Sequence, residues 1–301
     1  MVTPQDAIAT LTDVFGRHTG YRALHAKGRF YTGTFTATPA AAKLTRAGHM
    51  QGEPVPTLVR LSHGAGHPRM PDGRPVPRGM AVRFTLPDGS DTVLSAQTAR
   101  LFVTRSVEGF LAFTRAAQPS VASLWRFPML VARHPEIVRT LRANSVALRI
   151  PASYATCAYH GLHAFRWVDA EGGSRFVRYH WAPAAGESFL SPWQARKRGG
   201  DFLAGELAER LASGPVRFRL DLQFAGPGDS TTDPSAPWRR TDTVAAGTLE
   251  LTGPAPEDPE AGGGVVVYDP ANVTDGIELP DDEILRFRSE VYSASVEQRL
   301  G

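Results

Sequence analysis

The residues with the clearest chemical pattern lie near the end of the chain. Arg288, Tyr292 and Arg299 recur at intervals of four and seven residues within PDDEILRFRSEVYSASVEQR. At about 3.6 residues per helical turn, this spacing places the three side chains on one face, together with the small Ser295. Such a face is better suited to binding an anionic or planar ligand than to packing in a hydrophobic core. Taken alone, the pattern is more typical of a solvated polar helix face.

A second candidate lies near the start of the chain, where His25 stands among small and apolar residues in RALHAKG. An imidazole titrates close to neutral pH, so it can accept and donate a proton during a reaction. A lone histidine in such surroundings is more often a hydrogen-bonded core group. The segment therefore indicates a catalyst only in combination with other evidence.

Several other chemistries are unexpected. His160 and His163 are three residues apart in a predicted strand, so their side chains face opposite sides and cannot easily share an ion. The sequence contains no HExxH, EF-hand loop, GxSxG or glycine-rich phosphate motif, which argues against non-haem metal catalysis and serine hydrolysis. Because Cys157 is the only cysteine, an intrachain disulfide and a thiolate metal cluster are also excluded.

Composition indicates a well-packed globular protein. Of the 301 residues, 42% are hydrophobic and 21% are charged, and the formal net charge is +3. This charge is too small to predict a nucleic-acid partner. We find neither a signal-peptide pattern nor an apolar run long enough to cross a membrane, so we expect a cytoplasmic protein without a membrane partner. No linker divides the chain, and residues 1–301 are expected to form a single domain.

Hydrophobic periodicity predicts an α+β fold built on an antiparallel sheet that closes into a barrel. Alternation is clearest in VRFRLDLQFA, residues 216–225. Asp72-Gly73 and Asp88-Gly89 predict turns. Strands are further predicted at 33–38, 58–62, 79–86 and 246–253, a hairpin at 153–183, and helices from Thr3-Pro4 onward and over 40–50, 107–142, 192–212 and 280–299.

Four segments, in this order, resemble the haem domain of the catalase family. They are RALHAKGRFYTGTF, then VRLSHGAG with PRGMAVRF, then YHGLHAFRWV with RFVRYHW, and finally YDPANVTDGIELPDDEILRFRSEVY. The resemblance extends from about residue 20 to the C-terminus. Because the chain stops just past the last of these segments, it is most similar to the short catalase-related peroxidases. The resemblance implies an antiparallel β-barrel of the catalase type with flanking helices.

The resemblance also implies a role for particular residues. Tyr292 is expected to bind the haem iron as a phenolate, and Arg288 to donate a hydrogen bond to its oxygen. His25 is the expected acid and base on the other side of the haem, with Ser62 as its partner. The other expected contributors are Arg22, Arg60 and Arg299 at the haem propionates, Phe110 near the ring, and His163 and Asp282 in a hydrogen-bonded relay toward Arg288.

Elementary electrostatics supports this assignment. A free tyrosine has a pKa of about 10, so a phenolate at neutral pH needs a nearby positive charge. Two unit charges ~4 Å apart interact by about 4 kcal/mol at an effective dielectric constant of about 20. An arginine one helical turn away can supply that charge and does not deprotonate. The implied activity is a haem b peroxidase that uses hydrogen peroxide to oxidise a small organic donor through a ferryl intermediate.

The sequence departs from the catalase pattern at one important position. Catalases carry an asparagine beside the catalytic histidine, shortly after a strand that here reads Asp91-Thr92-Val93. Leu94-Ser95-Ala96-Gln97-Thr98 follows and contains no asparagine, although Gln97 could replace it with a longer side chain. A positioned hydrogen-bond donor contributes about 2–4 kcal/mol to a transition state. We therefore expect weak catalase activity and better oxidation of an organic donor.

Two further functions stay open. The same haem could serve an enzyme that converts an organic, such as lipid, hydroperoxide, or an oxidase of specialised metabolism. Catalase-related allene oxide synthases usually carry threonine before the histidine, where this chain has Leu24. A non-enzymatic haem or ligand carrier would need no proton shuttle, so the pairing of His25 with Ser62 argues against it. A homodimer is the default expectation for the assembly.

Overall fold

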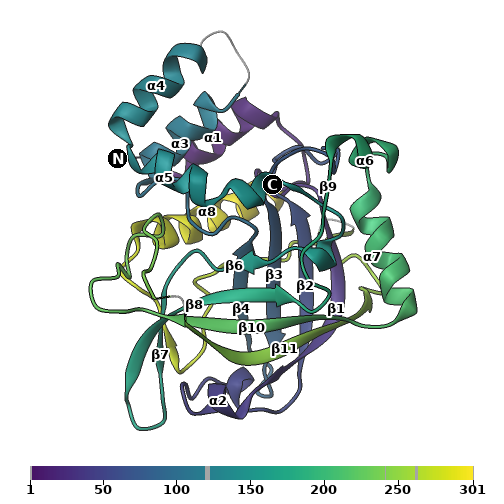
Figure 1. The fold of residues 1–301 in the computed structure, drawn as a ribbon, viewed down its shortest axis with the longest axis vertical. Helices are drawn as coiled ribbons and strands as arrows, with labels where there is room; N and C mark the ends of the chain where they lie inside the picture. Colours follow the sequence, from purple (N-terminus) through teal and green to yellow (C-terminus); the bar gives the residue numbers. More distant parts are fainter. Residues whose placement is uncertain (1, 119–122, 241, 262–263, 301) are drawn as a thin grey trace.

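An antiparallel β-barrel forms the centre of the molecule, with helices grouped at one end and along one side (Figure 1). The structure is a computed structural model and describes residues 2–118, 123–240, 242–261 and 264–300, with side chains except at 123–124 and 297–300. Every strand pair in the described ranges is antiparallel. The predicted fold class, an α+β protein with a catalase-type barrel, is confirmed.

Eight strands close the barrel, because β8 pairs with both β6 and β10. In their order around the barrel they are β8 (Ser174–Pro183), β10 (Val216–Phe224), β11 (Thr243–Pro254), β1 (Gly28–Ala37), β2 (Val55–His63), β3 (Arg78–Thr85), β4 (Asp91–Gln97) and β6 (Tyr159–His160). The first half of β8 also pairs with β7 (Phe165–Val168), which continues to β12 (Ile277–Glu278). A separate pair joins β5 (Ile150–Pro151) to β9 (Phe189–Leu190).

Large apolar side chains fill the barrel. In β10 the side chains of Val216, Phe218 and Leu220 are buried and alternate with exposed arginines, as strand periodicity requires. Phe35 lies edge-on to Trp181, with ring centroids 6.0 Å apart. A barrel filled in this way is a packed core rather than a channel. The ligand cavity must therefore lie outside it.

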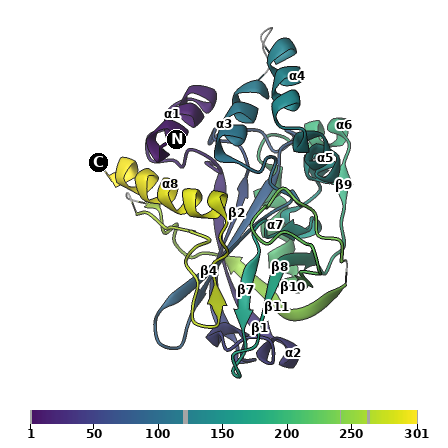
Figure 2. The same cartoon turned by 90° about the vertical axis from the view of Figure 1, so that its left-hand side faces the viewer.

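Three helices, α1, α3 and α8, pack on one another over one end of the barrel (Figure 2). Buried apolar residues of all three, such as Ala7, Leu111 and Ile284, form one cluster there. The helices are α1 (Pro4–Phe15), α2 (Pro39–Ala42), α3 (Val107–Ala116), α4 (Ser123–Arg133), α5 (Glu136–Ala143), α6 (Pro192–Lys197), α7 (Phe202–Ser213) and α8 (Glu283–Leu300). Three 3-10 turns cover Gly48–Met50, Ser145–Leu148 and Tyr154–Thr156. In the described part of the chain, no helix could span a membrane.

The sequence predicted the strands of the barrel more accurately than the extent of the helices. The expected helix over 40–50 is only the four-residue α2 followed by a 3-10 turn. The helical region 192–212 divides into α6 and α7 at Gly199-Gly200, where Gly199 has a positive φ of 86°. The first arm of the hairpin, 153–168, is also not one strand, since a 3-10 turn, β6 and β7 share it. Within 107–142 the structure forms α3, α4 and α5, and residues 119–122 lie outside the described ranges.

His49 provides a test of this core that does not depend on function. Its imidazole is buried against Phe35 and Phe84, and burial lowers its pKa from 6.5 to about 3. Between these values a proton binds the unfolded chain but not the folded protein, so the free energy of unfolding falls as the pH drops. Each such histidine adds about 1.4 kcal/mol per pH unit to the slope.

We predict that His49→Phe makes this slope shallower by about that amount, because one fewer proton is taken up on unfolding. Urea unfolding curves at several pH values between about 4 and 6 would measure it, within the window that the two pKa values of His49 define. Met50→Leu, a change at a neighbouring buried side chain without a titratable group, should alter stability and leave the slope intact. An unchanged slope in His49→Phe would show that His49 is already protonated in the folded protein.

Candidate active-site cavity

A cavity of about 620 Å³ lies between the end of the barrel and the helices that cover it. Its walls come from β2, β3 and β4, from α1, α3 and α8, and from the segments around residues 22–25 and 265–268. Most of the lining side chains are aliphatic or aromatic. Pockets that hold cofactors typically measure about 300–1,000 Å³, with mainly apolar walls and a few placed polar groups. Of the residues predicted from the sequence, this cavity is lined by Arg22, His25, Arg60, Ser62, Phe110, Arg288 and Tyr292.

His25 and Ser62 form the first polar pair of the cavity. The Nδ1 atom of His25 lies 2.9 Å from the hydroxyl oxygen of Ser62. His25 has a φ of 56°, the only positive φ at a non-glycine residue within the described ranges. Such a backbone conformation is costly for a residue with a Cβ and is typical of functional sites. When Nδ1 carries the proton and donates to Ser62, Nε2 keeps a lone pair that can accept another proton.

Gly79 leaves the space in which this pair forms. A Cβ at Gly79 would lie 2.6 Å from the Ser62 oxygen and 2.7 Å from His25 Nδ1. Ser62 on β2 and Gln97 on β4 are both directly opposite Gly79 on β3. Residues directly opposite each other in a sheet point to the same face. The amide of Gln97 therefore shares a face with the Ser62 hydroxyl, on either side of the bare glycine.

The electrostatic environment keeps His25 neutral. Burial, together with the positive charges of Arg60, Arg288 and Arg22, lowers its pKa from 6.5 to about 3. The exposed part of the side chain faces the cavity that it lines. At neutral pH the imidazole is therefore uncharged, with one ring nitrogen free to accept a proton. This protonation state is the one that a proton-accepting catalyst needs.

Tyr292 and Arg288 enter the cavity from α8, one helical turn apart. The Nη1 group of Arg288 donates to Nε2 of His163, at 2.9 Å. No hydrogen bond joins Arg288 to the Tyr292 oxygen among the described residues, so the expected direct bond between them is not formed in this structure. The guanidinium has further N–H groups that are not used by His163.

His163 connects Arg288 to the beginning of α8. Its Nδ1 atom lies 2.7 Å from the Oδ2 atom of Asp282, and both side chains are almost fully buried. The other oxygen of Asp282 accepts from the amides of Ile284 and Leu285, at 2.9 and 3.1 Å. Because Nδ1–H donates to a carboxylate, Nε2 is the acceptor for Arg288. Burial lowers the pKa of His163, which favours this neutral form although Asp282 opposes the shift.

Two further arginines lie at the cavity wall. Arg22 forms an ion pair with Glu260, at 2.7 Å, and donates to the carbonyl of Val266. Arg60 donates to the carbonyl of His25, at 2.9 Å, and burial lowers its pKa to about 10. The Nε atoms of both arginines are buried without a hydrogen-bond partner among the described residues. The side chain of Arg299 lies outside the described residues, so its expected contact stays a prediction.

Phe110 lies on α3 and packs against Phe102, with ring centroids 5.1 Å apart, in the apolar part of the cavity. The structure thus gathers residues from most of the chain. His163 and Asp282 stand behind Arg288 and are not among the lining residues. His160, three residues earlier, instead contacts His180, with their Nδ1 atoms 2.8 Å apart, so the two histidines belong to different networks as their spacing predicted.

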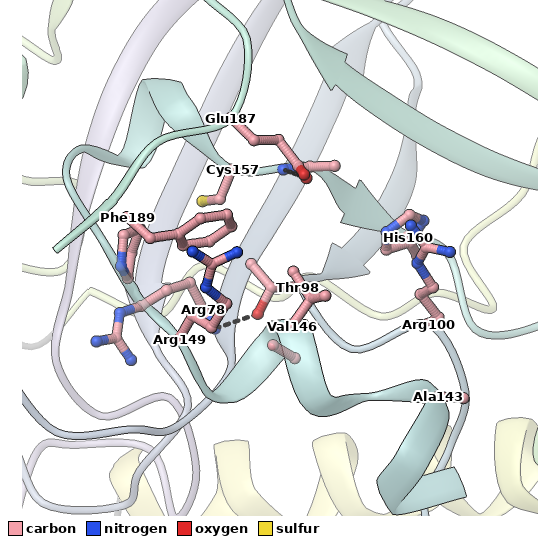
Figure 3. A pocket seen from close by; sticks show the side chains of 13 residues that line it. Arg78, Thr98, Arg100, Ala143, Val146, Arg149, Cys157, His160, Glu187 and Phe189 are labelled. Carbon is pink, nitrogen blue, oxygen red and sulfur yellow. Dashed lines mark hydrogen bonds between the residues drawn. The ribbon is translucent and has the colours of Figure 1, made fainter. Parts of the chain in front are cut away.

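A second, much smaller pocket of about 10 Å³ lies beside Cys157 (Figure 3). Its residues include Arg78, whose backbone amide donates to the Thr98 hydroxyl at 3.0 Å. The pocket has room for about one water molecule. Burial raises the pKa of the Cys157 thiol to about 12, so this cysteine is not a reactive thiolate. The pocket is too small for an organic substrate.

Comparison with known proteins then places this geometry in a family. A family model described as Catalase matches residues 17–301. The chain belongs to the catalase family. A catalase-related peroxidase of Mycolicibacterium paratuberculosis is 53% identical over 300 residues, which cover 100% of this chain and 96% of that protein. One of Synechococcus elongatus is 32% identical, over 99% of this chain and 89% of that protein.

The fold comparison agrees. A solved structure titled "Structure of a bacterial catalase" superposes with a TM-score of 0.80 at 22% identity, over 95% of this chain and 58% of that chain. The resemblance to short catalase-related peroxidases that the sequence indicated is confirmed. Membership of this family also confirms the expectation of an oxidoreductase that acts on peroxide.

Catalase-family membership implies a haem cofactor, and the residues of the cavity fit one. A haem has apolar faces and two carboxylates at one edge, so it needs apolar walls together with cations. The cavity supplies both, and the unpartnered Nε atoms of Arg22 and Arg60 are donors that carboxylates could satisfy. A tyrosine and a histidine line the same space.

Sequence reasoning missed two contributors to this site. Glu260 lies in a stretch that reads as a plain loop, yet its carboxylate pairs with Arg22, which is 238 residues away in the chain. Gly79 was noted only within the motif PRGMAVRF, although its missing side chain makes room for the His25–Ser62 pair. A glycine inside a strand pattern is the signal that could have indicated such a close approach.

We predict that Gly79→Ala breaks the His25–Ser62 hydrogen bond, because the new methyl group would occupy its space. The rate of peroxide consumption by the haem-loaded protein should fall at least about tenfold, since general acid–base catalysis contributes about 10²–10⁴-fold. Gly253→Ala is the matched control, because a Cβ at that strand position meets no atom within 4 Å. Equal rates in the two variants would show that the pair does not depend on Gly79.

Proposed function

We propose that this protein is a haem b peroxidase that uses hydrogen peroxide to oxidise a small organic donor, with only weak dioxygen production. The observation that carries the proposal is the pair His25–Ser62 at a cavity that Tyr292 also lines. A neutral imidazole and a phenol oxygen in one apolar space are the groups that peroxide chemistry at a haem requires. The printed names of the relatives support the peroxidase assignment.

The haem would be held by residues from both ends of the chain. Tyr292 would bind the iron through its phenolate oxygen, and Arg22, Arg60 and Arg299 would hold the two carboxylates. Phe110 would contact the ring from α3. When bound, the haem would supply a redox-active iron that peroxide oxidises and that the organic donor then reduces.

His25 moves the proton. Its Nε2 lone pair would accept a proton from one oxygen of hydrogen peroxide and return it to the other oxygen, which can then leave as water. Cleavage of the O–O bond also requires two electrons, which the bound haem would supply. Ser62 holds the opposite ring nitrogen and so fixes which nitrogen carries the lone pair. The lowered pKa of His25, about 3, keeps the base available over the whole physiological range.

Arg288 positions and stabilises the negative phenolate oxygen of Tyr292. It lies one turn before Tyr292 on α8, and its remaining N–H groups can donate to that oxygen. His163 accepts from Arg288, and Asp282 accepts from His163, so the guanidinium is oriented by two buried partners. Such partners behind a ligand usually tune its basicity.

Gln97 supports the proposed preference for organic donors. We infer that it replaces the asparagine that catalases carry beside the catalytic histidine, and its position opposite Gly79, which puts its amide on the same face as Ser62, supports this. One extra methylene displaces the amide nitrogen from the site of a shorter asparagine. Oxidation of a second peroxide molecule depends on a donor at that site, so this half of the catalase cycle should be slow.

The experiment compares oxygen evolution with oxidation of a phenolic donor in the purified haem-loaded protein. We predict that donor oxidation dominates in the wild type, and that Gln97→Asn raises oxygen evolution by up to about 100-fold, the size of one positioned donor. Gln5→Asn, on the exposed surface of α1, is the matched control and should change neither rate.

Two results would contradict the proposal. One is oxygen evolution far faster than donor oxidation in the wild type. The other is rapid conversion of a fatty-acid hydroperoxide in the absence of any electron donor, which would identify an isomerase or dehydratase instead.

A further inference from the structure

Helix α4 carries the most exposed large apolar side chain of the described residues, Trp125, together with the exposed Met129. Trp125 is 76% exposed and Met129 is 56% exposed. Both views of the fold show α4 projecting at the outer end of the molecule, far from the barrel (Figures 1 and 2). Scattered single apolar residues on a surface are common, whereas a tryptophan and a methionine together on a projecting helix are not.

The two side chains lie on one face of the helix. Trp125 and Met129 are four residues apart, and the exposed Pro128 and Ala132 lie beside them on the helical wheel. The opposite face belongs to the protein interior, where Leu130 is buried with Ala116 of α3 and Ile137 of α5. The inner face of α4 is therefore already packed against α3 and α5. The apolar side chains on its outer face are not needed for that packing.

Positive charge borders this face. Arg126 and Arg133 are both exposed and follow Trp125 by one and eight residues, which places them along one edge of the apolar strip. Between residues 123 and 149 the sequence has five arginines and one acidic residue, Glu136. That carboxylate lies 3.5 Å from His134 and is largely buried. Within residues 123–149 the surface is thus apolar and cationic, and the one acidic residue is largely buried.

We propose that the exposed face of α4 docks the protein on an anionic phospholipid surface. A tryptophan places its ring among lipid headgroups, and neighbouring arginines bind the phosphates. An antiparallel two-fold contact between copies of the chain through this face is disfavoured, because it would bring the arginine edge of one copy against the arginine edge of the other. The helix would lie on the membrane and would not span it.

The location of α4 fits this partner. The segment that follows it supplies Leu141 and Leu148 to the wall of the large cavity, and Leu148 is 44% exposed. The continuous segment from α4 to Leu148 therefore connects the exposed face of α4 to the wall of the cavity. The sequence predicted no membrane partner, because an exposed strip on a short helix cannot be distinguished from a buried one by hydropathy alone. The proposal goes beyond the peroxidase activity and does not depend on it.

The test is co-sedimentation of the haem-loaded protein with vesicles of equimolar phosphatidylcholine and phosphatidylglycerol. We expect binding that weakens as salt rises from about 0.1 to about 1 M, because the Debye length shortens from about 10 to about 3 Å. Vesicles of phosphatidylcholine alone should bind much less protein. Arg126→Gln combined with Arg133→Gln should lower the partition coefficient about thirty-fold, or about fivefold for each arginine.

The apolar half of the face is tested by Trp125→Ser with Met129→Ser, which should lower the partition coefficient at least about tenfold. The matched control is Trp193→Ser on α6, because Trp193 is 64% exposed and also lies beside a cation, Lys197. This control should bind vesicles as the wild type does. All variants should retain the haem absorbance and the oxidation of a soluble donor, so that loss of docking is separable from loss of the enzyme.

Three results would overturn the proposal. The first is absence of vesicle binding by the wild type at low salt. The second is equal loss of binding in Trp193→Ser, which would indicate unspecific adsorption. The third is a dimer in light scattering that the Trp125→Ser and Met129→Ser variant dissociates, which would assign this face to a second copy of the chain.

Discussion

Burial of positive charge around an apolar cavity is the constraint on which the site depends. Arg22, Arg60 and Arg288 all line the space that His25 lines. A buried charge is costly unless it is paired and hydrogen-bonded. The protein compensates only in part, with one carboxylate for Arg22, backbone carbonyls for Arg60 and a neutral histidine for Arg288. The remaining positive potential adds to the effect of burial in lowering the pKa of His25, and it makes the cavity suited to a ligand that carries two carboxylates.

Compensating these charges ties distant parts of the chain together. The Arg22–Glu260 pair joins the first segment to the last loops, and Asp282 joins His163 to the first turn of α8. The packing of α1 on α8 also holds the two ends of the chain together. The carboxylate of Asp282 caps α8, and α8 positions Tyr292, the proposed iron ligand. The site therefore forms only when the barrel and the covering helices are both in place.

Local sequence patterns predicted what depends on local structure. Alternation in VRFRLDLQF gave the correct strand, and Thr3 forms the capping box that begins α1. Helix ends were harder, since the region 107–142, predicted as helical, forms three separate helices. Long-range pairing such as Arg22 with Glu260 leaves no local signal, and neither does the outward orientation of Trp125. Resemblance to catalases brought His25, Ser62 and Tyr292 together, whereas composition and spacing left each of them ambiguous.

The central claim is that Tyr292 binds the haem iron on one side of the haem, while His25 accepts and donates protons on the other side. The most direct test is the absorption spectrum of the ferric haem-loaded protein beside that of Tyr292→Phe, with the circular dichroism of both as a check of folding. The account predicts a tyrosinate-type haem spectrum that is lost in the variant while the fold is retained. An unchanged haem spectrum in Tyr292→Phe, or a wild-type protein that folds but takes up no haem, would contradict it.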